Sequence, residues 1–305
     1  MKRYTILLIT FLMMFSLIAC MPINVTHPET KIIQPELVQE NIYTFADGET
    51  VDIYAHSGKD KLYRLANGAV ILTESKGFHD IFNYEDENYS FSEDDIFLQL
   101  DENVQKNILT HYHNLGKLYN LETELENAYA IYQRRVNEGI TYWTGESDED
   151  GVVHFRGPSI TQRTFLTGYN DTFICFDTEL YKPLPITLQP YKEDYEVYQN
   201  VEDLSGGYGF ATIFDVKTGE IINQYDMFTI PADKIGEVLL SIPDYLSDEE
   251  REIMIKALKP EYLFFDKEYL FISFPHESID NIGHTIPLKY SEISLILQPW
   301  AVPKR

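Results

Sequence analysis

The sequence predicts an α+β fold in which an antiparallel sheet is packed with helices. Patterns typical of helices and of strands occupy separate stretches of the chain, which is characteristic of this class. Apolar residues recur at helical spacing from residue 101 to 137, whereas short strand-like runs dominate from residue 160 onward. Hydrophobic residues make up 44% of the chain, with many Tyr and Phe, so we expect a folded core rather than a disordered chain.

The chain begins with an apolar segment of 14 residues, 6–19, that follows the basic pair Lys2 and Arg3. A membrane-spanning helix needs about 20 apolar residues, whereas the core of a signal peptide needs only about 7–15. The segment ends in LIAC at 17–20, which resembles the lipobox of bacterial lipoproteins. We therefore predict a lipoprotein signal peptide at 1–19 and lipid attachment at Cys20. An ordinary secretory signal and a short N-terminal anchor are the alternatives.

Lipid attachment at Cys20 predicts a chain that is held on a membrane by a diacylglyceryl group and does not span it. Removing residues 1–19 leaves 286 residues, with 22 basic and 49 acidic side chains and a net charge of −27. A field of this sign repels nucleic acid and favours basic proteins or cations, so we expect no nucleic-acid partner. The second cysteine, Cys175, stands in an apolar run and is predicted to be a buried thiol.

Residues 20–40 contain three prolines and predict a tether between the lipid and the folded part. Residues 41–98 predict a small β-rich region, and 99–139 a helical segment made of a helical hairpin or one kinked helix, because Gly116 interrupts the pattern. Within these regions the predicted elements are strands at 50–54 and 69–72 and helical patterns at 101–118 and 121–137.

Residues 140–305 predict the main α+β domain. The glycine-rich run at 205–209 lacks the Lys-Ser/Thr that completes a phosphate-binding loop, so we interpret it as a flexible connection. The predicted elements are strands at 160–166 and 172–180 joined by a turn at 167–171, a strand at 210–216 with a turn at 217–220 and a return strand at 221–222, helices within 231–258, and final strands at 268–274 and 284–288.

Three stretches of this domain resemble the extracellular domain of RsiV-like proteins. They are ICFDTELY at 174–181, FDVKTGEIINQYDMF at 214–228, and the closing segment at 270–300, which carries Gly283, Ile286-Pro287 and Tyr290-Ser291-Glu292. The resemblance covers roughly 165–300 and depends on the order and spacing of short motifs. It implies one of three contexts: the lysozyme-binding outer domain of an anti-sigma-V factor, a module appended to peptidoglycan deacetylases, or an uncharacterised lipoprotein.

The third context is the one we expect, because we find neither a predicted membrane span nor the metal-binding His and Asp motifs of a deacetylase. The resemblance suggests lysozyme as a ligand. In the family, the closing hairpin often carries an aromatic-acidic-proline stretch before its glycine. Here that position holds PHESIDNI at 275–282, which departs from the family pattern on which lysozyme binding would depend. His276, Glu277 and Asp280 in this segment are the candidate partner-binding residues.

Two short patterns could suggest metal ions. His111 and His113 stand two residues apart, so on a helix they point about 200° away from each other and we expect both to face solvent. The acidic run at 146–151 resembles half of a calcium loop, but its twelfth position is Gly157, so we predict a hydrated hairpin tip. The sequence therefore predicts no catalytic residue, no metal site and no cofactor.

These observations predict a membrane-anchored, extracytoplasmic lipoprotein of the bacterial cell envelope that acts as a non-enzymatic binding module. Its expected ligand is a basic envelope or host protein of the lysozyme type. The alternatives are a peptidoglycan- or glycan-acting hydrolase that uses carboxylates such as Asp215, Glu277 or Asp280, and an envelope scaffold protein. Two facing carboxyl groups about 5–9.5 Å apart in a cleft would favour the hydrolase.

Overall fold

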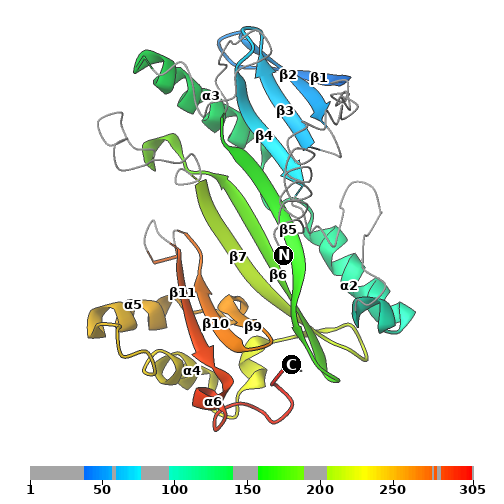
Figure 1. The fold of residues 1–305 in the computed structure, drawn as a ribbon, viewed down its shortest axis with the longest axis vertical. Coiled ribbons are helices and arrows are strands. Elements are labelled where there is room, and N and C mark those ends of the chain that lie inside the picture. Colours follow the sequence, from blue (N-terminus) through cyan, green and yellow to red (C-terminus); the bar gives the residue numbers. More distant parts are fainter. Residues whose placement is uncertain are drawn as a thin grey trace, which may run out of the picture. The chain divides into compact units, whose positions relative to one another are not determined.

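A computed structural model describes residues 38–56, 60–76, 96–139, 157–188, 205–276, 278–279 and 283–303, which belong to the compact unit Leu37–Arg305. It confirms the α+β class, with an eight-stranded sheet, a three-stranded sheet and packed helices (Figure 1). The predicted signal peptide, Cys20 and the tether up to residue 37 lie outside the described residues. None of the helices in the described ranges has the length and hydropathy needed to cross a bilayer.

The strands of the large sheet lie side by side in chain order. Neighbours pair antiparallel, except that β4 and β5 pair parallel. Parallel neighbours need a crossover connection, and two helices stand in it. The strands are β1 (Val38–Thr44), β2 (Thr50–His56), β3 (Asp60–Leu65), β4 (Val70–Lys76), β5 (Ser159–Tyr169), β6 (Phe173–Pro183), β7 (Ser205–Asp215) and β8 (Ile221–Ile222).

The crossover contains two separate helices, α2 (Glu102–Leu115) and α3 (Leu121–Asn137). Asp101 caps α2 and Asn120 caps α3, in each case by accepting a hydrogen bond from a backbone N–H of the first turn. Gly116 ends α2 at a φ of 61°, a left-handed value that glycine adopts without strain. The single kinked helix is therefore excluded. The helices pack in different buried clusters, α3 with β2–β4 and α2 with β6 and β7.

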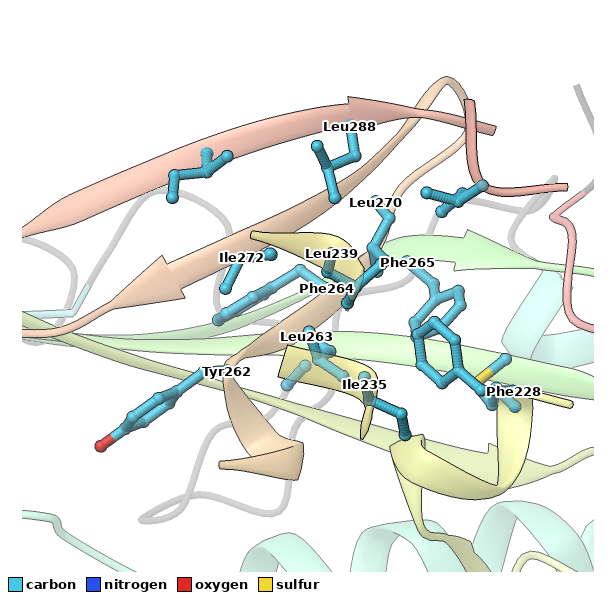
Figure 2. Close-up of a cluster of buried hydrophobic side chains, with 14 of the residues drawn as sticks. Phe228, Ile235, Leu239, Tyr262, Leu263, Phe264, Phe265, Leu270, Ile272 and Leu288 are labelled. Carbon is cyan, nitrogen blue, oxygen red and sulfur yellow. The ribbon is translucent and has the colours of Figure 1, made fainter. Parts of the chain in front are cut away.

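A second layer covers the opposite face of part of the large sheet. It consists of a three-stranded antiparallel sheet in the order β11-β10-β9 and of short helices. Figure 2 shows their side chains, among them Phe228, Leu263 and Leu270, converging in one buried cluster. The elements of this layer are α4 (Ala232–Leu239), α5 (Asp248–Ala257), β9 (Leu263–Phe265), β10 (Tyr269–Phe274), β11 (His284–Lys289) and α6 (Tyr290–Ile293), with 3-10 turns η6 (Gln224–Met227) and η7 (Pro260–Tyr262). Two further 3-10 turns lie outside it: η2 (Ile96–Gln99) shares the cluster of α2, and η3 (Ile186–Leu188) contacts α3.

Strand β6 separates the two layers because its side chains alternate between the faces of the sheet. Ile174 and Phe176 share a cluster with α2, whereas Phe173 and Cys175 share the cluster of the second layer. The Cys175 thiol is buried as predicted, and burial raises its pKa to about 12, so it is not a thiolate nucleophile at neutral pH.

Two sequence interpretations need correction. The run at 205–209 is not a flexible connection, because it forms the start of β7 and pairs with β6 from Ser205 opposite Pro183 onward. The strand can pair here because glycine has no side chain: a Cβ on Gly207 would lie 3.1 Å from the Tyr181 ring, which is tighter than an ordinary contact. His113 is exposed as predicted, but the His111 ring packs edge-on against Phe214, and burial lowers its pKa. The acidic run at 146–151 lies outside the described residues.

Candidate binding cleft

A cleft of about 640 Å³ lies between β5–β7 of the large sheet and the β10–β11 hairpin. This volume falls in the range of about 300–1,000 Å³ that is usual for small-molecule pockets. Its lining combines charged groups, hydroxyl groups and aromatic rings. The cleft begins where the second layer ends, because the sheet face that carries buried Cys175 continues along β6 into Asp177, Glu179 and Tyr181.

Strand register brings the polar side chains of the floor together. Arg163 of β5 stands opposite Glu179 of β6, and Thr161 stands opposite Tyr181. Side chains that are directly opposite in an antiparallel pair project from the same face. On the other side of β6, Gly209 stands opposite Glu179, and a Cβ built there would have no neighbour closer than 3.7 Å. The floor is therefore crowded over β5 and β6, whereas at Gly209 of β7 it has room for a methyl group in ordinary contact.

Arg163 and Glu179 form an ion pair along the floor. The Nε and Nη2 atoms of Arg163 lie 2.6 Å and 2.5 Å from the same carboxylate oxygen, Oε2 of Glu179. The guanidinium carbon also lies 5.5 Å from the ring centre of Phe165 and 5.8 Å from that of Tyr181. Burial lowers the pKa of Arg163, but Glu179 and Tyr181 together raise it by more, so the guanidinium stays charged.

Asp177 is the unusual group of the cleft. Its Oδ1 atom is buried and has no hydrogen-bond partner among the described residues. Burial, together with the nearby charge of Glu179, raises the pKa of Asp177 to about 8, although Arg163 acts in the opposite direction. At neutral pH the group is therefore mostly a neutral acid that can donate a hydrogen bond. In its ionised form, the Asp177 carboxyl group would carry a negative charge in a largely buried position.

The opposite wall comes from the β10–β11 hairpin. The backbone N–H of His276 donates to the Gly207 carbonyl oxygen at 3.1 Å, which joins the hairpin to β7. The Nδ1 atom of His276 is buried, and no described residue supplies it with a partner. Ser273 and Thr285 share a hydrogen bond of 3.2 Å between their hydroxyl groups, and both residues line the cleft. The wall thus offers hydroxyl groups and an imidazole.

The predicted site residues fall in different places. His276 lines the cleft, whereas Glu277, Asp280 and Cys20 lie outside the described residues. Asp215 is not in the cleft: it ends β7 and accepts hydrogen bonds from the backbone N–H groups of Lys217 and Thr218 at 2.7 and 2.9 Å. Asp215 is therefore a turn residue, and it is no longer a candidate catalytic carboxylate for the hydrolase alternative.

Sequence reasoning missed Arg163, Asp177 and Glu179. One signal could have found two of them. In ICFDTELY, residues 174–181, alternation places Asp177 and Glu179 on the same face as the buried Cys175, so two acidic side chains extend a face that is otherwise apolar. Within the described ranges, no group of three or more His, Cys, Asp or Glu residues is arranged to hold a metal ion.

No family model matches the chain, and no curated protein matches it. Among solved structures, a DUF3298 family protein from Pseudomonas aeruginosa PAO1 is similar at 11% identity and a TM-score of 0.32, with 48% of this chain and 65% of that chain covered. The chain thus spans less than two thirds of that protein. A member of the same family from Bacteroides fragilis NCTC 9343 is similar at 10% identity and a TM-score of 0.37, covering 88% of this chain and 96% of that one.

Both of these similar structures are described as DUF3298 family proteins. At identities of 10% and 11%, the assignment to the RsiV-like family itself stays a prediction.

Proposed function

We propose that this protein is a membrane-anchored, extracytoplasmic binding module for a basic protein. One observation carries the proposal: the cleft holds two carboxyl groups, Asp177 and Glu179, but a single described cation, Arg163, which is already paired with Glu179. The whole chain repeats this imbalance, with 49 acidic and 24 basic residues and a net charge of −25. A basic protein would be attracted over a distance by the overall charge and held by the cleft.

Lysozyme is the ligand to test, because the resemblance to RsiV-like proteins suggests it. Full-length protein in detergent should give a binding signal by calorimetry with lysozyme at about 20 mM salt and a weaker one at about 150 mM, since the Debye length falls with ionic strength. Lysozyme with acetylated lysines is the control, because acetylation removes the positive charge while keeping the partner's fold. If no heat were detected at either salt concentration, lysozyme would not be the ligand.

The membrane anchor is tested separately. The proposal expects radiolabelled palmitate to enter the protein and the Cys20→Ala variant to leave the membrane fraction, because acyl chains bind a bilayer with about 0.8 kcal/mol for each buried CH₂. A variant that fractionates like the parent would contradict lipid attachment at Cys20 and would leave the binding proposal standing.

A hydrolase is the second candidate, and the cleft itself supports it. Asp177 and Glu179 lie two residues apart on one face of β6, and the raised pKa of Asp177 keeps it protonated. Glycosidases use such a pair, with the protonated carboxyl as general acid and the ionised one as base or nucleophile. Binding remains the stronger proposal because Arg163 makes both of its short contacts with one oxygen of Glu179, which restrains that carboxylate. Release of soluble fragments from peptidoglycan by the wild type, and its loss in Asp177→Asn, would establish the hydrolase instead.

A further inference from the structure

We propose that the cleft is a cation site in which the carboxyl group of Asp177 receives a guanidinium or ammonium group from a basic side chain of the ligand. This inference rests on the proposed function and specifies the chemistry of the same cleft. It assigns the binding role to Asp177, a residue outside the closing hairpin segment at 275–282.

The geometry provides both the space and the contacts for a cation. An atom at the Cβ position of Gly209 would lie 3.8 Å from Oδ1 of Asp177 and 3.9 Å from Cζ of the Phe264 ring. The cleft is therefore lined at one position by Gly209, by the Phe264 ring and by the carboxyl group of Asp177, whose buried Oδ1 atom has no described partner. A guanidinium or ammonium group that enters here would gain a charge-assisted hydrogen bond to the Asp177 carboxyl group, beside the apolar rim of the Phe264 ring.

The surrounding charges leave this position for an external cation. On β5, Arg163 is directed to Glu179, and on β6 the following basic residue, Lys182, pairs with Glu124 of α3 at 2.7 Å. Strand β7 places Ala211 opposite Asp177 and so adds no charge. The other titratable groups are Cys175 and Tyr181 on β6, on which the charge of Asp177 acts, and Tyr208 of β7 and His276 of the hairpin wall, which line the cleft. None of these supplies a permanent positive charge.

Cation binding should therefore be linked to pH. With its pKa near 8, Asp177 is mostly protonated at neutral pH, and an entering cation favours the ionised form, so binding releases a proton. Affinity for a cation should rise with pH and level off above about pH 8.5. A neutral ligand that accepts a hydrogen bond from the protonated acid, such as a sugar, would show the opposite slope, because ionisation removes the donor.

The test uses full-length protein in detergent and a small probe, n-propylguanidinium, whose charge does not change over the pH range. The neutral n-propylurea has a similar shape and is the control probe. We expect affinity for n-propylguanidinium to rise about tenfold per pH unit between about pH 6 and 7.5, with close to one proton released, as counted by calorimetry in two buffers of different ionisation enthalpy. At about pH 9 no proton should be released.

Two variants test the residue. Asp177→Asn should lose both the pH dependence and the proton release, whereas Asp244→Asn, which changes an exposed carboxyl, should behave as the wild type. Gly209→Ala fills the space with a methyl group whose contacts of 3.7–3.9 Å are ordinary, and it should weaken probe binding at every pH. Circular dichroism and thermal unfolding of each variant show whether it is folded.

The outcomes separate this inference from the proposed function. Probe binding that is independent of pH, that falls as pH rises, or that persists in a folded Asp177→Asn variant overturns the cation site. Lysozyme binding that is unchanged by Asp177→Asn also overturns it, while the binding function stands. Probe binding with the expected slope and no lysozyme binding supports the cation site and overturns lysozyme as the ligand.

Discussion

At the scale of single residues, Glu74 resembles Asp177 in burial and differs from it in partners. It accepts hydrogen bonds from the Tyr63 hydroxyl at 2.7 Å, from the Lys117 ammonium at 2.6 Å and from the Tyr119 hydroxyl. Burial raises the pKa of Glu74, but these three donors together lower it below its ordinary value. Two buried carboxyl groups in one sheet thus shift in opposite directions, and the number of donors aimed at each decides the sign.

We predict that Glu74→Gln lowers the free energy of unfolding by about 1–3 kcal/mol at neutral pH. Lys117 loses the carboxylate charge of Glu74, and the glutamine amide places N–H donors beside groups that are themselves donors. Because the pKa is lowered in the folded state, this contribution is complete above the unfolded pKa, near 4.5, and disappears as pH falls through the folded value. Urea unfolding at several pH values measures it, with exposed Glu268→Gln as the control. Equal stability of the Glu74 variant at neutral pH would contradict it.

At Gly168 the two sheets approach each other closely. A Cβ at this position would lie 2.0 Å from the carbonyl oxygen of Phe265 in β9, a distance that no packed structure accepts. Gly168→Ala should therefore lower the free energy of unfolding by at least about 2 kcal/mol, because either β5 or β9 must move. Gly209→Ala is the matched control, since the same methyl group meets only ordinary contacts there. Similar midpoints for both variants in thermal unfolding would show that the two strands are not this close.

At the scale of elements, one side chain connects the β5–β6 turn to the last segment of the chain. The Oδ1 atom of Asn170 accepts hydrogen bonds from the N–H groups of Thr172 and Phe173 at 2.8 and 3.1 Å. Its Nδ2 atom donates to the carbonyl oxygens of Trp300 and Val302 at 2.7 and 2.9 Å. The turn and the segment that follows α6 therefore depend on the same amide.

We predict that Asn170→Ala destabilises the protein by about 1–3 kcal/mol through both the turn and the closing segment. Asn170→Asp keeps the acceptor of the turn but places a second oxygen against the carbonyl oxygens of Trp300 and Val302, so its effect should fall on the closing segment. Amide hydrogen exchange distinguishes the two contributions. In Asn170→Asp, protection should be retained in the turn at Thr172 and Phe173 and should fall in the segment 300–303. Equal loss in both regions would show that the turn does not form independently of the closing segment.

Elements marked by a local sequence pattern were predicted, whereas those that depend on contacts with distant strands were missed. Helical spacing is local, and it located α2 and α3 to within a few residues. Alternation located β5, β6, β10 and β11. Strand β9 was missed because a run of three apolar residues has no period, and the start of β7 was missed because glycines indicate a strand only when a partner such as Tyr181 lies over them.

The candidate site was less predictable for a related reason. The two carboxyl groups of the cleft stand on one strand, so the sequence alone places them on one face. Their environment depends on Arg163, Gly209 and Phe264, which come from other strands and are brought together only by pairing and by the stacking of the second sheet. His276 was singled out from the sequence and lines the cleft, but the chemistry assigned to the cleft centres on Asp177.

At the scale of the whole molecule, the parallel pairing of β4 with β5 joins the first four strands to the rest of the sheet. The residues 41–98, which the sequence set apart as a β-rich region, supply most of these strands. The cluster that contains Val51 and the cluster that contains Leu270 both include side chains of β6, on its two faces. We infer that neither side of the sheet can lose its packing without affecting the other.

This arrangement predicts one cooperative unfolding transition for the compact unit. Val51→Ala and Leu270→Ala lie in different clusters, yet each should shift the same calorimetric peak to lower temperature, with a loss of about 2–4 kcal/mol for Leu270→Ala. The ratio of calorimetric to van't Hoff enthalpy should stay near one in both variants. Two separated peaks, of which each variant shifts a different one, would show that the first four strands unfold independently.

The outer strands of the two sheets have a further consequence for a protein crowded among its own copies. An open strand edge invites another chain to add to it. Here β8 and β9 are only two and three residues long, β1 carries a register irregularity between Gln39 and Asn41, and β11 contains Pro287, which has no N–H to donate. Each rim thus discourages edge-to-edge growth, so dense arrays of this chain should stay unaggregated.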